Sequence, residues 1–227
     1  MTQNKTDKRK TRAEAKKKAE QRIRVVAGIV VLLVVAGIIW AIVSSQKSTA
    51  SQQQTAANAD KYSAYPAMTI DKAKKYTATF KLAKGGEFTV ELYPDKAPKT
   101  VNSFVFLARE KYFDGTTFHR VLEGFMAQGG DPTGTGSGGP GYEFENEDSD
   151  LKFDKPGVFA MANAGRDTNG SQFFVTFAAT PQLDGGYTIF GQVTDGMDVV
   201  NGITRRDPQT NPGFTGDVIE SVTITEK

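Results

Sequence analysis

The side chains best suited to chemistry in this chain are polar groups set among apolar residues in two stretches. The stretches read TTFHRVLEGFMAQGGD (116–131) and FAMANAGRDTNGSQFF (159–174). Their prominent polar residues are Arg120, Gln128, Asn163 and Gln172. We find no recognisable nucleophile or metal-binding cluster in either stretch. One guanidinium, several amides and an apolar floor are typical of a groove that binds an extended peptide and perturbs a bond without cutting it.

Three other motifs suggest chemistry and are explained more simply. His119 is the only histidine, and strand alternation places it on the opposite face from Arg120, which favours a structural role. Ser171 lies in NGSQF, which lacks the G-x-S-x-G elbow of serine hydrolases. The GTGSGG run at 134–139 is followed by Pro140 rather than by a helix, so dinucleotide binding is not expected.

Composition restricts the function further. The chain has 227 residues and no cysteine, which excludes disulfides, thiolate nucleophiles and Cys-ligated zinc. Residues 1–24 carry ten Lys and Arg against three acids, a net charge of +7, whereas residues 60–227 carry seventeen against twenty-three, a net charge of −6. A mildly acidic body gives no electrostatic reason to expect nucleic acid as a partner.

An apolar run divides the basic head from the body. Residues 25–43 read VVAGIVVLLVVAGIIWAIV, nineteen residues without a charge. A helix of this length is about 28 Å long, close to the roughly 30 Å core of a bilayer. The apolar part of a signal peptide is usually shorter, about 7–15 residues. We therefore predict an uncleaved transmembrane helix in contact with membrane lipid.

The charges around this run predict its orientation. Basic residues crowd its N-terminal side and only Lys47 follows closely, so we expect a single-pass protein of the cell membrane with a cytoplasmic basic head (1–24) and an extracytoplasmic body. The Ser/Gln/Thr/Ala-rich stretch after the run lacks an apolar period. We predict a flexible tether over 44–65 and a single folded domain over 66–227.

The body has the pattern of a mainly β domain. Apolar residues alternate over 76–82 and 88–92 around Gly85-Gly86, which predicts a hairpin. Pro98 suits the first turn of a helix that has one apolar face. Further strands are predicted at 118–122, 126–128, 158–161, 173–177, 188–193 and 218–225, with a short helix near 197–203. Many strands and two helices indicate a capped barrel.

Two longer motifs carry a family resemblance. FDGTTFHRVLEGFMAQGGDPTGTGSGG and FAMANAGRDTNGSQFFVTFAATPQLDGGYTIFG resemble, in order and spacing, the cyclophilin family of peptidyl-prolyl cis-trans isomerases. With the anchor and tether, the chain resembles membrane-anchored bacterial cyclophilins. The resemblance implies a closed eight-stranded antiparallel barrel with a helix over each end, and isomerase activity that needs no cofactor and no metal.

The implied reaction explains why no acid, base or metal is needed. An X-Pro bond interconverts slowly because amide resonance imposes a barrier of roughly 18–20 kcal/mol. A donor aimed at the prolyl nitrogen stabilises the twisted state more than either planar state. Arg120 has a rigid, permanently charged fork suited to this task. Gln128 resembles the polar partner that orients Arg120 and meets a substrate carbonyl.

The remaining site residues are assigned by the resemblance alone. The backbone around Asn163 matches the position that pairs with the substrate chain. Two departures stand out: Gln182 replaces a Trp common in the family, and Tyr187 replaces a common His, which weakens the expectation of tight binding by cyclosporin-type inhibitors. The predicted proline pocket comprises Phe125, Met126, Phe174 and Leu183. The other predicted substrate-binding residues are Gly136, Ala162, Asn163, Ala164, Gln172 and Tyr187.

Two functions from different classes remain open. The first is an isomerase that accelerates the proline-limited folding of exported polypeptides. The second is a non-catalytic chaperone or scaffold that holds proline-containing segments at the membrane. Arg120 favours the isomerase, because a pure binder does not require a donor directed at the prolyl nitrogen. In either case the expected partners are proline-containing polypeptides, and we expect a monomeric ectodomain.

Overall fold

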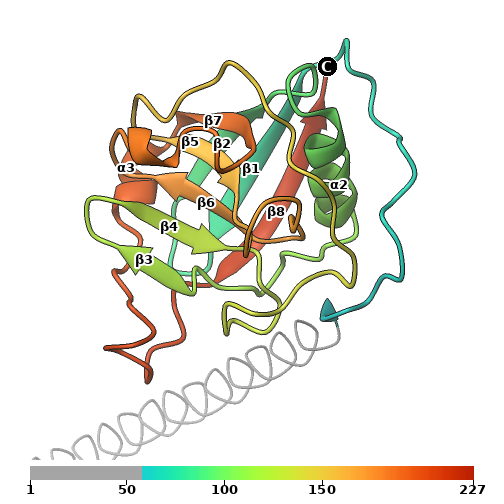
Figure 1. Cartoon of the computed structure of the whole chain (residues 1–227). Coiled ribbons are helices and arrows are strands. Elements are labelled where there is room, and N and C mark those ends of the chain that lie inside the picture. The colour runs from blue at the N-terminus through green and yellow to red at the C-terminus, as the bar shows by residue number, and fades with distance from the viewer. Residues whose placement is uncertain (1–57) are drawn as a thin grey trace, which may run out of the picture. The chain divides into compact units, whose positions relative to one another are not determined.

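The computed structural model of the protein describes residues 58–227 (Figure 1). This part is mainly β, with eight antiparallel strands and few helices. The strands are β1 (Tyr76–Leu82), β2 (Glu87–Leu92), β3 (Arg120–Leu122), β4 (Met126–Gly129), β5 (Val158–Met161), β6 (Phe173–Thr176), β7 (Ile189–Asp195) and β8 (Ile219–Glu226). The helices are α2 (Pro98–Arg109), α3 (Met197–Asn201) and the 3-10 turn η1 (Pro181–Leu183).

The strands form one sheet in the order β3-β4-β6-β5-β7-β2-β1-β8. The two outermost strands, β3 and β8, approach each other through the residues next to them. Thr117 forms an isolated antiparallel bridge with Val218, and the N–H of Phe118 donates to the carbonyl of Asp217 at 2.9 Å. The eight strands and their antiparallel pairing are as predicted, but the closed barrel is not: β3 and β8 stand at the two ends of the strand order and meet through the segments beside them.

The inner face of the sheet holds an aromatic core. On β1 and β2 every second residue is buried, as the alternation predicts. Phe80 and Phe88, which are directly paired across the hairpin, stack with ring centroids 4.7 Å apart. Phe159 of β5 and Phe173 of β6 pack edge-on against Phe80, and Phe104 of α2 packs against it at a tilt of 39°. This core holds β5 and β6 rigidly, and their other face forms part of the candidate site.

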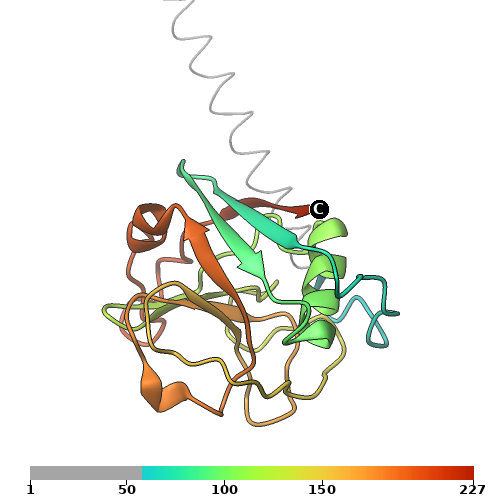
Figure 2. The same ribbon diagram turned by 90° about the horizontal axis from the view of Figure 1, so that it is seen from above.

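The helices α2 and α3 lie at opposite sides of the sheet (Figure 2). Pro98 occupies the first turn of α2, as predicted, and one face of the helix, including Val101 and Val105, is buried. The carboxylate of Glu147 accepts from the N–H groups of Lys99 and Thr100 at 2.9 and 2.8 Å. Glu147 thus caps the N-terminus of α2, where a negative charge is favourable.

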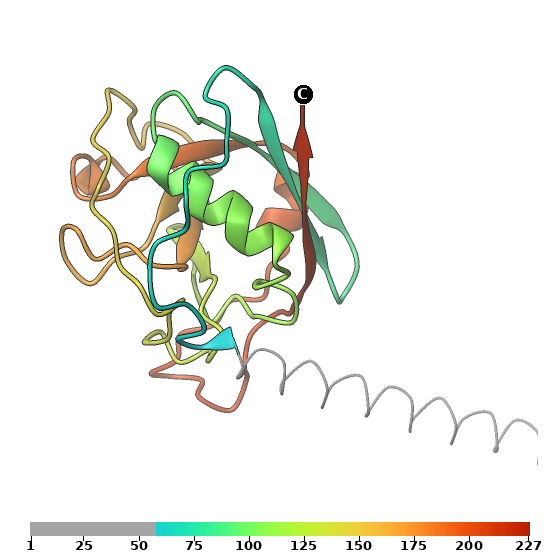
Figure 3. The ribbon, with the colours of Figure 1, turned by 90° about the vertical axis from the view of Figure 1, so that its right-hand side faces the viewer.

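Residues 58–70, called the strap from here on, precede β1 and run along the outer side of α2 (Figure 3). The amide of Asn102 on α2 donates to the carbonyl of Ala67 at 3.1 Å, and its oxygen accepts from the N–H of Thr69 at 2.8 Å. The tether was expected to reach residue 65. Its last part, 58–65, is instead docked on the domain, because Tyr62 and Tyr65 supply aromatic surface to bury.

The predicted basic head, the transmembrane helix at 25–43 and the tether up to residue 57 lie outside the described residues. Among the helices of residues 58–227, none has both the length and the apolar character needed to cross a bilayer.

Candidate functional site

A row of side chains crosses the outer face of the sheet and contains the two residues predicted to be catalytic. Arg120 on β3 lies directly opposite Gln128 on β4, and Gln128 lies opposite Phe174 on β6. Phe174 in turn lies opposite Ala160 on β5. Directly paired residues of an antiparallel sheet point to the same face. The register therefore places a guanidinium, an amide and an aromatic ring side by side.

The apolar part of this row belongs to a second hydrophobic cluster, separate from the aromatic core. Its buried members are Met126, Phe153, Val158, Ala160, Phe174 and Ile189. Half-buried residues pack around them, namely Leu122, Phe125, Leu151, Ala162, Leu183 and Tyr187. The structure thus brings together every residue predicted for the proline pocket, on the same face as Arg120.

The geometry of this cluster suits a flat apolar ring. Phe174 stacks on Phe153 at 5.8 Å with an interplanar angle of 13°, and Tyr187 meets Phe174 edge-on at 5.4 Å. Leu183 comes from the η1 turn, and Tyr187 comes from the loop between η1 and β7. Phe174 is almost fully buried, whereas Leu183 and Tyr187 remain half-exposed. The half-exposed pair forms the wall that an incoming side chain can contact.

A chain of hydrogen bonds holds Gln128. Its amide donates to the side-chain oxygen of Gln172 at 2.9 Å. The amide of Gln172 donates to the carbonyls of Gly136 and Gly138 at 3.1 and 2.9 Å. Because Gln172 is bonded on both sides, it fixes the orientation of the Gln128 amide, and with it the group next to Arg120.

The glycine-rich loop that anchors Gln172 is folded around Asp131. This carboxylate is 0% exposed and accepts hydrogen bonds from the N–H groups of Thr133, Gly136 and Gly138 at 2.7, 2.6 and 3.2 Å. Burial alone would raise the pKa of Asp131, but these hydrogen bonds outweigh it, and the pKa lies below its ordinary value. Asp131 is thus an ionised group that supports the loop. The GTGSGG run at 134–139 lies in this loop and is not followed by a helix.

A groove of about 650 Å³ opens beside the apolar cluster. Ala162 belongs to both, so the two parts are continuous. Its lining contains the other predicted substrate-binding residues, namely Gly136, Asn163, Ala164 and Gln172. The candidate site therefore has an apolar pocket and a polar groove, with Gln128 and Gln172 between them.

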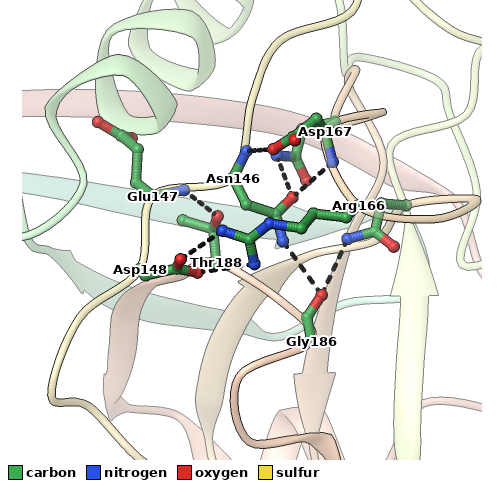
Figure 4. Close-up of polar contacts among 9 residues, drawn as sticks. Asn146, Glu147, Asp148, Arg166, Asp167, Gly186 and Thr188 are labelled. Carbon is green, nitrogen blue, oxygen red and sulfur yellow. Dashed lines mark hydrogen bonds and ion pairs between the residues drawn. The ribbon is translucent and has the colours of Figure 1, made fainter.

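A hydrogen-bond network that joins three loops includes Asn146, Asp167 and Gly186 (Figure 4), and Asn163 is bonded to it through Gly186. The amides of Asn163 and Asn146 both donate to the carbonyl of Gly186, at 3.3 and 3.2 Å. The side chain of Asn146 also accepts from the N–H of Asp167 and from the amide of Asn169. Within residues 58–227, the main-chain N–H and C=O of Asn163 have no hydrogen-bond partner. They are available to pair with an extended peptide.

The two alternative catalytic residues are placed as structural groups. His119 is 2% exposed, and burial lowers its pKa. Ser171 is also buried, and its hydroxyl donates to the carbonyl of Gly130 at 2.7 Å and to the hydroxyl of Tyr112 at 3.3 Å. Ser171 is not among the hydrogen-bond partners of His119 within the described residues. The geometry of a serine nucleophile is thus missing there.

Sequence reasoning missed two supporting residues, Asp131 and Asn146. Both are buried and polar, and each organises a loop through several hydrogen bonds. The sequence offers one usable signal for Asp131, which lies just before a run of glycines and threonines. The main-chain N–H groups of such a run need a hydrogen-bond acceptor. Nothing local marks Asn146, whose partners lie 21 to 40 residues away.

Comparisons with known proteins agree with this geometry. The family model described as cyclophilin type peptidyl-prolyl cis-trans isomerase/CLD matches residues 77–226. Peptidyl-prolyl cis-trans isomerase-like 1 of Neurospora crassa is 48% identical over 148 residues, which cover 63% of this chain and 91% of that protein. The human protein of the same name is 54% identical over 133 residues, covering 56% and 80%. Both are eukaryotic, so they lend no support to the expected bacterial, membrane-anchored form.

A solved structure resembles the fold. The cyclophilin type peptidyl-prolyl cis-trans isomerase of Cryptosporidium parvum aligns with a TM-score of 0.62 and 35% identity, covering 67% of this chain and 99% of that one. A second crystal structure of that protein, in the presence of the dipeptide Ala-Pro, aligns with a TM-score of 0.61. The chain belongs to the cyclophilin-type peptidyl-prolyl cis-trans isomerases.

Proposed function

We propose that this isomerase accelerates X-Pro rotation by directing the guanidinium of Arg120 at the prolyl nitrogen while the apolar cluster holds the ring. A donor at that nitrogen favours the pyramidal form, in which the lone pair no longer conjugates with the carbonyl. The twisted state then gains more than the planar cis and trans states. Selective stabilisation of this kind lowers the barrier without moving the equilibrium.

The observation that carries the proposal is the cross-strand row of Arg120, Gln128 and Phe174. Arg120 is half-buried and has no ion-pair partner within residues 58–227, so its charge remains available to a substrate. Phe174 and its neighbours offer a ring-sized apolar surface on the same face. A cation beside such a surface suits an imide, whose ring is apolar and whose nitrogen becomes basic as it twists.

The groove supplies the second part of the proposal, which is alignment of the peptide. The main chain of Asn163, which has no hydrogen-bond partner among residues 58–227, can bond to an extended strand, a common mode of peptide recognition. Gln128, held by Gln172 at 2.9 Å, can meet the carbonyl of the residue before proline. Contacts on both sides of the X-Pro bond keep one end of the peptide still while the other end rotates about that bond.

We further propose that the domain works outside the membrane on exported polypeptides. The support is the uncharged run 25–43 and the excess of basic residues before it. Protease added to intact cells should remove the domain and spare the basic head. Protection of the domain in intact cells, with digestion only after lysis, would contradict this topology.

The test of the catalytic proposal compares wild type with Arg120→Ala, both as full chains in mild detergent. Exchange NMR on a short Ala-Pro peptide measures the rate of interconversion. Loss of one preorganised donor predicts a fall of about 10²–10³ in kcat/KM. Arg109→Ala is the matched control, because Arg109 pairs with Glu226 on the surface at 2.7 Å. Equal, slow rates with retained peptide binding would favour a non-catalytic chaperone instead.

A further inference from the structure

The strap lies outside the family match and yet forms part of the groove wall. The family model begins at residue 77, whereas Asp60 lines the 650 Å³ groove together with the 136–143 loop. The N–H of Asp60 donates to the carbonyl of Gly139 at 3.0 Å, and the N–H of Tyr62 donates to that of Pro140 at 2.9 Å. These two main-chain hydrogen bonds hold the strap against the loop.

Two further features fix the strap in this position. The ring of Tyr62 packs edge-on against Phe106 of α2 at 5.1 Å, and the hydroxyl of Tyr65 donates to the carbonyl of Lys99 at 2.6 Å. Gly141 has a φ of +96°, and a methyl group there would collide with the carbonyl oxygen of Tyr62. The strap thus sits directly on the backbone of the loop, and the position of Asp60 is defined by its surroundings.

The charged residues that line the groove are both acidic. They are Asp60 from the strap and Glu143 from the loop, and no Lys or Arg lines it. Within residues 58–227 neither carboxylate has an ion-pair partner or a hydrogen bond from a side chain. An acidic, partly enclosed wall attracts cations and repels anions, and the effect weakens with added salt.

We propose that Asp60 and Glu143 make the groove selective for proline-containing peptides that carry a Lys or Arg side chain near the proline. The proposal rests on the function above, because the groove continues from the apolar pocket through Ala162. A peptide whose proline fills the pocket places a neighbouring side chain over the groove. Asp60 is then a specificity-determining residue contributed by a segment outside the family match.

The experiment varies charge on both partners. Peptides carry Lys, Gln or Glu at each of the two positions before and the two positions after an Ala-Pro pair, and exchange NMR gives kcat/KM with the full chain in mild detergent. Exchange NMR needs no coupling protease, whose own charge preference would distort the measured rates. At low salt, at one of these positions, we expect a Lys peptide to be favoured about two- to fivefold over the Glu peptide, as for an exposed ion pair.

The variant Asp60→Asn combined with Glu143→Gln should bring this Lys-to-Glu ratio close to one. Asn suits the backbone at residue 60, where φ is +51°, because Asn tolerates the left-handed region as well as Asp does. Asp198→Asn on α3, exposed and outside the groove lining, is the matched control and should keep the ratio. Addition of about 1 M NaCl, where the Debye length is about 3 Å, should reduce the wild-type ratio.

The failures of the two proposals are distinguishable. An active enzyme that treats Lys, Gln and Glu peptides alike at every position would refute the inference and leave the catalytic proposal intact. A Lys preference that persists in the double variant would also refute it, because the selectivity would then arise elsewhere. Absence of catalysis on the neutral Gln peptides would refute the catalytic proposal, and the inference with it.

Discussion

Arg120 and Gln128 are direct cross-strand partners on β3 and β4, and Gln128 is held from behind by Gln172 at 2.9 Å. The guanidinium therefore stands next to an amide that cannot turn freely. Because Gln172 is itself bonded to two loop carbonyls, a chain of hydrogen bonds connects the glycine-rich loop to the amide beside Arg120. This arrangement leads to the first prediction.

Gln128→Ala and Gln172→Ala should each lower kcat/KM by about fivefold, the value of one neutral hydrogen bond of roughly 1 kcal/mol. The double variant should lose little more than either single variant, because both act through one network. Exchange NMR on an Ala-Pro peptide gives the three rates. Gln209→Ala, in an exposed loop, is the control. Fully additive losses would show that the two glutamines act separately.

Tyr187 tests whether the half-exposed wall of the apolar cluster binds the substrate. Its ring meets Phe174 edge-on at 5.4 Å, and within residues 58–227 its hydroxyl has no hydrogen-bond partner. Tyr187→Phe should therefore keep both KM and kcat within about twofold, while Tyr187→Ala should raise KM about tenfold, as expected for loss of roughly 1.5 kcal/mol of apolar contact. A fall in kcat at unchanged KM would assign the ring to the chemical step instead.

Much of the fold could be predicted because its elements carry strong local signals. The β1–β2 hairpin combines strict alternation with a Gly-Gly turn, and α2 begins with Pro98. Each strand pattern was found within about two residues, since core packing demands the alternation that the sequence displays. The placement of Arg120 and Gln128 on one face follows from the same period and from the short turn between their strands.

The parts of the fold that could not be predicted depend on contacts between residues far apart in the sequence. Residues 58–65 of the strap read as the end of the predicted tether, yet Tyr62 and Tyr65 contact aromatic partners more than 40 residues away. The acidic run after Tyr142 carries no local sign of a contact with α2, yet Glu147 caps α2 and Lys99 pairs with Glu145. A cap supplied from another segment leaves no trace beside the helix, so only the folded arrangement reveals it.

Gly141→Ala should destabilise the domain by more than about 1 kcal/mol and loosen the strap. Gly141 has a φ of +96°, and an added methyl group would collide with the carbonyl oxygen of Tyr62. Urea unfolding followed by near-ultraviolet circular dichroism measures the change. Gly213→Ala is the matched control, because an added methyl group there meets no atom within 4 Å, and its effect should stay within about 0.5 kcal/mol. Equal effects of the two substitutions would mean that the strap is not packed on Gly141.

His119 should make the stability of the domain depend on pH from its ordinary pKa of 6.5 down to its lowered pKa in the folded protein. Burial lowers its pKa in the folded protein; Asp131 acts to raise it, and Arg206 and Arg120 lower it further. Above the ordinary pKa of 6.5 both folded and unfolded His119 are neutral, and the stability is fully present. As the pH falls below that value the unfolded chain binds a proton first, so the free energy of unfolding falls, by at most about 1.4 kcal/mol per pH unit, until the folded pKa is reached.

His119→Leu isolates this contribution, because the chain contains no other histidine. Both imidazole nitrogens are buried without a hydrogen-bond partner among the described residues, so an apolar side chain can occupy the site. The free energy of unfolding of wild type and variant is measured in urea at several pH values. From pH 6.5 downward, the wild-type value should fall steadily relative to that of the variant. The pKa of Asp131 is lowered, so its own titration falls below its ordinary 3.8 and outside this window. A difference that stays constant with pH would mean that folded His119 takes up its proton as readily as the unfolded chain does.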